Sequence, residues 1–494
     1  MTSATDGAAS GGLSPAKKFA ALAWSILMIV PCVWHRHIEA GDLGSHIYNA
    51  WLAQLIAKGQ APGLYIVRQW DNVLVDWLLL HAANVFGFSA AQKIVVSLCV
   101  LVFFWGVFFF VGAFARRPPW SLAPCFAMLA YGYSFNMGFL NYYLSLGLAC
   151  CSFALLWRGR EVARLVGVLL VPLVILAHPL GLLWLAGVAL YLVLWTKLPR
   201  WWKLAVPVSA IAVLGAIHWY LAHAVKFPVD FHRDPFYFLN GADQLILYGS
   251  RYAVLAWVTV GFGAVCVALD FVARRRDPEF WKSLRLPAGL YFVAIVATAL
   301  LPENLRPSID GGWIGLLVSR LTVITAIFGL CFFAFLRSRK LHAIGFAACA
   351  LVFFAFLYQD TLVLNRMEAA TDRLVSTLPP GTRVLSTIWA PPDSRVSFVA
   401  HFVDRACIQR CFSYANYEPA SRQFRIRVRE GSPVVSASDD DNEDMQAGEY
   451  EVQDEDLPMV EIYQCDPANL TKLCLRTLAA GEKNGRLGYK PPSD

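Results

Sequence analysis

A carboxylate and an imidazole lie four residues apart in the segment EAGDLGSHIYNAWLAQLIAKGQAPGLY, residues 39–65. If a helix begins at or before Asp42, then Asp42 and His46 share one face, because residues four apart are neighbours on a helix. A carboxylate held in this way can accept a proton from an attacking hydroxyl group. The alternative is structural, with Asp42 or Ser45 capping an amphipathic helix. The sequence leaves both interpretations open.

A second acidic position follows in RQWDNVLVDWLLLHAANVFG, residues 68–87. Asp71 could assist Asp42. Asp76 stands among apolar residues, where an unpaired charge is costly, so it is either interfacial or functional. We expect Asp42, His46 and Asp71 to be the catalytic residues, and we favour Asp42 over Asp71 as the catalytic carboxylate.

Cationic and polar side chains near the ends of other apolar runs could bind an anion or a sugar. The candidates are Arg320, Arg251, His178, Arg306, Lys226, Arg233 and Asn141. Each has a structural alternative. Arg320 could extend to the membrane surface or pair with Asp310, His178 could be an interfacial hydrogen-bonding residue, and Asn141 could belong to an interfacial belt with its tyrosine neighbours. The polar loop FHRDPFYFLNGADQ, residues 231–244, could close over a substrate or be an ordinary exposed loop.

Composition identifies the elements that must position these groups. The chain has 494 residues, of which 57% are hydrophobic and 16% charged, whereas soluble proteins carry about 25% charged residues. The apolar residues fall in runs of about 20, the length that crosses a hydrocarbon core of about 30 Å. These features exclude a soluble globule, a disordered chain and a transmembrane β-barrel. They predict an all-α polytopic membrane protein.

Eleven apolar runs predict about 11 transmembrane helices within residues 17–360. They lie near 19–34, 92–115, 120–137, 140–157, 162–178, 180–196, 203–223, 248–272, 286–301, 314–336 and 341–360. Eighteen of the 27 Lys and Arg residues in 1–360 then fall on the side of Lys17 and Lys18. Basic residues mark the cytoplasmic side. The sequence therefore predicts a cytoplasmic tail at 1–16 and a large external first loop at 36–91 with interfacial helices.

The remaining residues, 361–494, are expected to form a small external α/β domain. They carry 15 basic and 20 acidic residues. An external position is oxidising, so Cys407, Cys411, Cys465 and Cys474 could form two local disulfides, although the sequence does not give their pairing. Strands are expected within 378–392 and 422–430, and the acidic segment 436–456 is expected to be a disordered insertion.

The sequence resembles the integral-membrane GT-C glycosyltransferases in the order of its first elements. One span is followed by an external Asp, a His one turn later, an amphipathic helix, and then Gly, Pro and Tyr residues after the helix. The spans, the long first loop and the trailing external domain are similar too. The resemblance implies an acidic residue in the first external loop that acts on the acceptor, here Asp42. It also implies a donor sugar carried on a polyprenyl phosphate, with the cations listed above around the phosphate.

These observations lead to the hypothesis of an inverting glycosyltransferase in a bacterial inner membrane, facing the periplasm or exterior. Its expected partners are membrane lipids, the lipid-linked sugar donor and a glycan or lipid acceptor, and no nucleic acid. No cofactor is expected and no metal ligands are assigned, while the sequence leaves a divalent-metal requirement open. CxxC, GxGxxG and Walker-type motifs are absent from the sequence, so it does not support a cytoplasmic ATPase or a zinc ribbon. Two alternatives remain: a secondary transporter or lipid flippase, which would place acids in mid-span, and a structural membrane component assembled through its tail.

Overall fold

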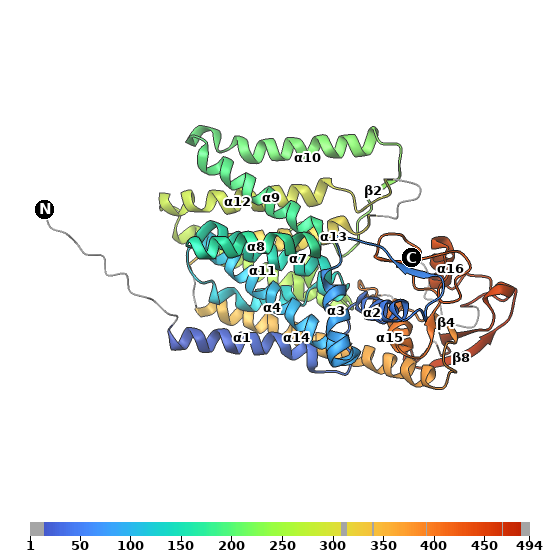
Figure 1. Cartoon of the computed structure of the whole chain (residues 1–494). Coiled ribbons are helices and arrows are strands. Elements are labelled where there is room, and N and C mark those ends of the chain that lie inside the picture. Colours follow the sequence, from blue (N-terminus) through green and yellow to red (C-terminus); the bar gives the residue numbers. More distant parts are fainter. Residues whose placement is uncertain (1–13, 308–313, 338–339, 392, 467, 486–494) are drawn as a thin grey trace.

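A computed structural model describes residues 14–485 except 308–313, 338–339, 392 and 467. Most of the expected tail 1–16, and Asp310 as a partner for Arg320, lie outside the described residues. Within them, helices run side by side in a body from which the C-terminal part extends at one end (Figure 1).

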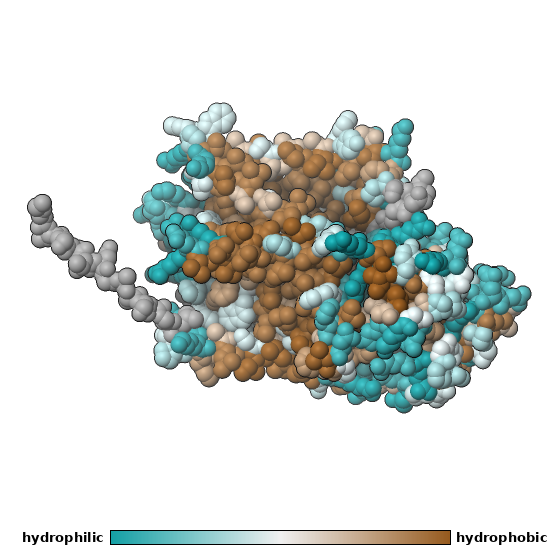
Figure 2. Space-filling model, in the orientation of Figure 1, coloured by the Kyte–Doolittle hydropathy of each residue, from teal (hydrophilic) through white to brown (hydrophobic). Residues whose placement is uncertain are grey.

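Eight segments are long and apolar enough to cross a membrane. They are α1 (Pro15–Val33), α4 (Phe88–Ala115), α7 (Leu140–Arg158), α9 (Pro179–Lys197), Arg200–His223 containing α10 (Ala205–His223), α11 (Ser250–Ala273), α12 (Pro278–Leu300) and α14 (Lys340–Ser376). Two shorter helices, α8 (Glu161–Ala177) and α13 (Leu317–Phe333), also follow expected apolar runs. Figure 2 shows a broad hydrophobic surface over these helices, with hydrophilic residues at both ends. The chain is therefore compatible with a multi-pass membrane protein.

The number of eleven spans is not confirmed, because the run 120–137 does not form one long helix. It is divided into a 3-10 turn, η1 (Trp120–Leu122), and two short helices, α5 (Ala123–Ala130) and α6 (Tyr133–Asn136). Gly132 is extended at the break, with φ −76° and ψ −171°. A residue with such angles ends one helix before the next begins. The break separates α5 from α6.

Residues 36–91 form folded structure between the helical body and the C-terminal part. Helix α2 (Leu43–Ala57) is buried from Leu43 to Ala53, and strand β1 (Leu64–Ile66) follows it. Helix α3 (Leu74–Phe86) lies across the ends of neighbouring helices in Figure 1. The expectation that helices of this loop lie in the membrane interface stays a prediction.

The C-terminal part has the mixed α/β structure that the sequence predicts. Its sheet has the order β5-β4-β7-β8, with β4 (Arg383–Thr387) parallel to β5 (Phe412–Ser413) and β7 (Met459–Gln464), and β8 (Leu473–Leu478) antiparallel to β7. The 3-10 turn η4 (Val399–His401) leads into α15 (Phe402–Cys407). Disulfides join Cys407 to Cys411 and Cys465 to Cys474.

This C-terminal part is joined closely to the first loop. Strand β6 (Ile426–Val428), in the expected 422–430 strand, pairs antiparallel with β1, and Tyr65 lies opposite Arg427. Helix α14 also continues past the expected boundary at residue 360 as far as Ser376. The boundary expected at residue 360 therefore falls inside α14, and one helix and one two-stranded sheet connect the two expected parts.

The expectation of disorder at 436–456 is also wrong. Helix α16 (Asp439–Ala447) begins at Ser438, whose side chain accepts a hydrogen bond from the Asp441 backbone. Met445 is fully buried in a small core with Leu385, Met459 and Leu478, among others. These few apolar anchors, together with the cap, order a segment whose composition is strongly acidic.

Candidate functional site

The backbone around Asp42 is fixed by the turn between α6 and α7. Gly41 N–H donates to the Asn136 carbonyl over 2.7 Å, and Asp42 N–H donates to the Met137 carbonyl over 3.2 Å. Gly138 in this turn has φ +81°, and a Cβ there would lie 2.3 Å from the Asp42 nitrogen. Only glycine fits this close approach. Two distant segments therefore hold the start of α2 in one position.

The Asp42 carboxylate does not cap α2. The residue occupies the N-cap position, but its side chain accepts no capping hydrogen bond. The side chain is 28% exposed and its Oδ1 lies 3.7 Å from Nε2 of His401, which is 5% exposed. The capping role that the structural alternative assigned to Asp42 is therefore not seen, and the carboxylate instead faces His401 of the C-terminal part.

His401 is itself held by a carboxylate. Its Nδ1 lies 2.7 Å from Oδ2 of Asp404, one turn further along in α15. Burial opposes a charge on the ring, but the hydrogen bond and charge of Asp404, with the charges of Asp42 and Glu418, raise the pKa of His401 above its usual value. The raised pKa favours the protonated form of His401, whose Nε2 faces Asp42. The ring of Tyr417 lies beside it, 5.7 Å between centroids.

Arg320, one of the cations expected to bind phosphate, lies in the electrostatic field of Asp42. Its guanidinium lies 4.4 Å above the Phe139 ring, and it interacts electrostatically with Asp42 and Tyr417. The Tyr142 hydroxyl donates to the Arg320 carbonyl over 2.7 Å and so fixes the first turn of α13. The side chain therefore reaches the same region as Asp42 from a helix nearly 280 residues further along the chain.

His178 lies close to Arg320. Its ring packs edge-on against Tyr142 at 5.6 Å, and its Nδ1 accepts from the Leu180 backbone at the start of α9. Burial and the positive charge of Arg320 lower the pKa of His178 to about 3, so the ring is neutral. His178 is thus a capping residue that also borders the cationic side of the site.

His46 and Asp76 form a buried pair beneath Asp42. Nδ1 of His46 lies 2.8 Å from one Asp76 oxygen, and the Asn141 amide donates to the other over 3.2 Å. Burial alone would lower the pKa of His46, but the charge and hydrogen bond of Asp76, with Glu418 and Asp42, raise it to about 10. Asn141 also accepts from the Val75 backbone. Asn141 therefore positions α3 and Asp76.

Glu418 completes this buried layer and was not expected from the sequence. Its carboxylate accepts hydrogen bonds from Ser45 Oγ over 2.7 Å and from the Asn49 amide. Burial raises the pKa of Glu418 to about 7, although His46 and Ser45 oppose the shift. Three side chains of α2 (Ser45, His46 and Asn49) thus face acidic partners from elsewhere in the chain.

Other expected site residues are directed elsewhere. Asp71 is exposed and has no hydrogen-bond or ion-pair partner among the described residues. Arg251 pairs with Asp360 over 2.5 Å, and Arg306 lies in the electrostatic field of Asp439 in α16. The acidic residue of the first loop that lies beside His46 is Asp76 and not Asp71.

The loop 231–244 is fastened to the protein by Arg395. This buried side chain lies 2.8 Å from Asp234 and 3.2 Å from Asp243, and it stacks on the Tyr133 ring at 3.9 Å. The Tyr237 hydroxyl also donates to the Thr298 carbonyl over 2.7 Å. These contacts favour a fixed wall of the site over a loop that closes on a substrate.

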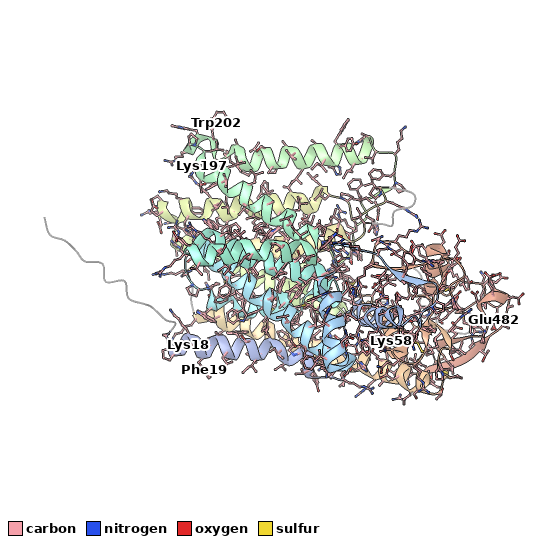
Figure 3. The ribbon with its side chains drawn as sticks, viewed as in Figure 1. Lys18, Phe19, Lys58, Lys197, Trp202 and Glu482 are labelled. Carbon is pink, nitrogen blue, oxygen red and sulfur yellow. A yellow bond between two sulfur atoms is a disulfide. The ribbon has the colours of Figure 1, made fainter. Side chains whose placement is uncertain are left out.

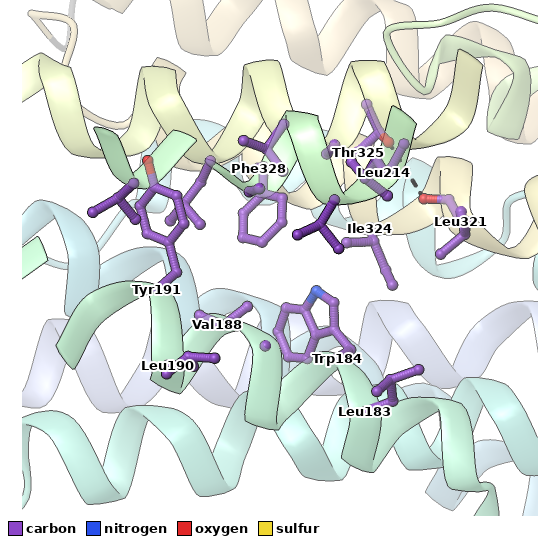
Figure 4. Close-up of a pocket in the computed structure, with 18 of the residues that line it drawn as sticks. Leu183, Trp184, Val188, Leu190, Tyr191, Leu214, Leu321, Ile324, Thr325 and Phe328 are labelled. Atoms are coloured by element: carbon purple, nitrogen blue, oxygen red, sulfur yellow. Dashed lines mark hydrogen bonds between the residues drawn. The ribbon is translucent and has the colours of Figure 1, made fainter. Parts of the chain in front are cut away.

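An apolar cavity of about 610 Å³ lies within the helical body. It lies among α9, α10, α12 and α13, and Trp184, Ile324 and Phe328 point into it (Figure 4). Tyr142 and Leu321, the neighbours of Arg320, line one end of it. Lining residues such as Leu183 are largely exposed, so the cavity opens on the apolar surface of the helical body.

No protein-family model and no curated protein matches the chain. The resemblance to GT-C glycosyltransferases therefore stays a hypothesis that depends on residues 39–65 and on the layout of the helices. Among the residues that the structure describes, no three His, Cys, Asp or Glu side chains form a group that could hold a metal ion.

The sequence analysis missed the contribution of the C-terminal part. His401, Asp404, Tyr417 and Glu418 are separated from Asp42 by more than 350 residues, and they belong to no motif. One signal was present: HFVDRAC at 401–407 places His401 and Asp404 three apart, on one face of a helix, next to a cysteine pair.

Proposed function

We propose that the chain is an integral-membrane glycosyltransferase that moves a sugar from a polyprenyl-phosphate donor to an acceptor hydroxyl. The observation that carries the proposal is the setting of Asp42. Its carboxylate is partly exposed at the rim of an apolar helical body, with His401 at 3.7 Å and Arg320 in its field. Glycosyl transfer from a lipid phosphate removes a proton from the acceptor and releases an anionic phosphate. A carboxylate beside cationic side chains can serve both steps, because the carboxylate accepts the proton and the cations stabilise the phosphate.

In the proposed reaction the acceptor oxygen attacks the anomeric carbon of the donor sugar and forms the new glycosidic bond. The bond from that carbon to the phosphate oxygen breaks, and its electron pair stays on the phosphate. Asp42 takes the proton of the acceptor hydroxyl. Arg320 and His401 balance the negative charge on the departing phosphate. One displacement of this kind inverts the configuration at the anomeric carbon.

The apolar cavity supports a lipid-linked donor. A polyprenyl chain is uncharged and flexible, and the side chains around the cavity are almost all apolar. Because Tyr142 and Leu321 line its end, a chain lying there would bring its phosphate to Arg320. We propose that this cavity holds the first isoprene units of the donor.

The distribution of acidic residues favours a transferase over a transporter. In the eight apolar segments acids occur only at the start of α12, near the end of α11 and beyond the apolar half of α14. A transporter that moves ions is expected to carry acids at mid-membrane depth. The two disulfides support placing the C-terminal part outside the cytoplasm, with the N-terminus inside.

A complementation experiment tests the proposal and identifies the substrate. A strain that lacks the protein should accumulate one polyprenyl-phosphate sugar and lack one glycan, as seen by mass spectrometry of lipids and surface glycans. The wild-type chain should reverse both changes and Asp42→Asn should reverse neither. Asp71→Asn, the same change at an exposed carboxylate of the same loop, should behave as wild type. Full complementation by Asp42→Asn at equal protein level would refute the proposal.

A further inference from the structure

A second cavity lies at the opposite end of the helical body, far from Asp42. This end carries Lys18 and Lys197, labelled in Figure 3. The cavity has a volume of about 710 Å³ and is bordered by the ends of α4, α11 and α13 and by the start of α12. Four arginines and one aspartate line it: Arg117, Arg274, Arg276, Arg337 and Asp277. Its lining is strongly cationic.

Two of these arginines are engaged by the protein and two are not. Arg117 donates to the carbonyls of Ala334 and Leu336 at the end of α13. Arg274 lies 3.1 Å from Asp277. The exposed side chains of Arg276 and Arg337 have no carboxylate partner within the described ranges. The fixed arginines thus shape the cavity while two cations stay available for an anion.

An apolar cavity of about 530 Å³ lies next to the cationic one, along the same two helices. Phe271 of α11 and Phe333 of α13 line it, while Arg274 and Ala334 line the cationic cavity. Three residues of helix correspond to about 4.5 Å. A groove for hydrocarbon therefore adjoins a pocket for an anion, at the level where a bilayer changes from acyl chains to head groups.

We propose that these two cavities together bind one anionic phospholipid. Its phosphate lies between Arg276 and Arg337, and an acyl chain lies along α11 and α13. Basic pockets between the cytoplasmic ends of membrane helices suit such lipids. A soluble phosphate compound would use the cationic cavity alone, whereas a phospholipid uses both. This site is separate from Asp42 and does not depend on the proposed transferase activity.

Native mass spectrometry of the full chain in detergent tests the proposal, with phosphatidylglycerol and phosphatidylcholine as probes. We expect the wild-type chain to retain the anionic lipid preferentially. The double variant Arg276→Gln/Arg337→Gln should weaken phosphatidylglycerol binding about 10- to 30-fold, because each arginine near the phosphate contributes roughly tenfold or less. The matched control Arg160→Gln/Arg164→Gln removes two exposed arginines that line neither cavity and should leave binding unchanged.

A substitution in the apolar cavity tests whether that cavity holds the acyl chain of the lipid. Ala264 lines that cavity and is exposed, so Ala264→Phe fills space without disturbing the buried core. It should reduce retention of phosphatidylglycerol while the arginines are intact. The proposal would be overturned if the chain bound both lipids equally, or if the control variant lost as much binding as the double variant. It would also be overturned if Ala264→Phe bound phosphatidylglycerol as wild type does, or if millimolar inorganic phosphate displaced the lipid.

Discussion

The two ends of the helical body use charge in opposite ways. At the end that the C-terminal part covers, His46, His401 and Glu418 are buried and each has a polar or charged partner. At the other end, arginines such as Arg160, Arg164 and Arg276 are exposed to solvent. Burying a charge is costly unless it is paired, whereas an exposed charge near a membrane needs no partner.

On the proposed function, this difference separates charges that orient the protein in the membrane from charges that form the site. The exposed arginines follow the bias expected of cytoplasmic loops. The buried groups converge on α2 from α3, α15 and the segment around Glu418, and Asp42 is the group among them that stays accessible. Breaking an ion pair at the end covered by the C-terminal part should therefore change stability or sugar transfer strongly. Removing a charge at the other end should change both only slightly.

The largest effect on stability is expected from Arg395→Met. The variant leaves Asp243 buried without its guanidinium partner, and breaking a buried pair costs about 3–5 kcal/mol. Thermal unfolding in detergent should show a clear decrease. Arg164→Met, at the exposed end, is the matched control and should unfold as wild type does. A normal unfolding temperature for Arg395→Met would contradict the comparison.

His401→Gln should have the next largest effect, on transfer. Losing the imidazole that faces Asp42 should lower kcat about 100- to 1,000-fold, by analogy with the loss of one charge-stabilising group. The unfolding temperature should change much less. His81→Gln, at an exposed position in α3, should keep normal kcat. If His401→Gln transferred sugar at the wild-type rate, the C-terminal part would have no role in the reaction.

The His46–Asp76 pair should make stability depend on pH. The pKa of His46 is raised from 6.5 to about 10, so its stabilising contribution is complete below about pH 6.5 and is lost as pH rises toward 10. Wild type should exceed His46→Gln in unfolding temperature at pH 6, and the difference should narrow steadily up to pH 9.5. A constant difference would show that this pair does not carry the charge assigned to it.

The smallest effect is expected from Arg160→Gln/Arg164→Gln. These exposed side chains have no ion-pair partner among the described residues, and surface substitutions of this kind usually change stability by less than about 0.5 kcal/mol. Unfolding temperature and transfer should both stay near wild type. A decrease like that of Arg395→Met would remove the distinction between the two ends.

Local pattern predicted the helices well, because long apolar runs between basic clusters leave few alternatives. The break of the run 120–137 at Gly132 could not be predicted, because hydropathy does not distinguish one long apolar helix from two short ones. The prediction of disorder at 436–456 was wrong because composition does not reveal that Met445 packs in a core with residues of β4 and β7.

Only the candidate site residues that belong to one short segment each could be predicted from the sequence. The spacing of Asp42 and His46, and a cation inside an apolar run at Arg320, are visible in one segment each. The pairs of His401 with Asp404 and of Glu418 with Ser45 depend on how the C-terminal part folds over α2. No spacing rule connects residues that tertiary packing brings together.

The most direct test of the central claim uses the purified chain and the donor found by complementation. Transfer by Asp42→Asn should fall by about 100- to 10,000-fold, the contribution of a general base, while binding of the donor and the unfolding temperature stay near wild type. Asp71→Asn measured beside it should transfer normally. Transfer by Asp42→Asn within twofold of wild type would contradict the assignment of Asp42 as the base.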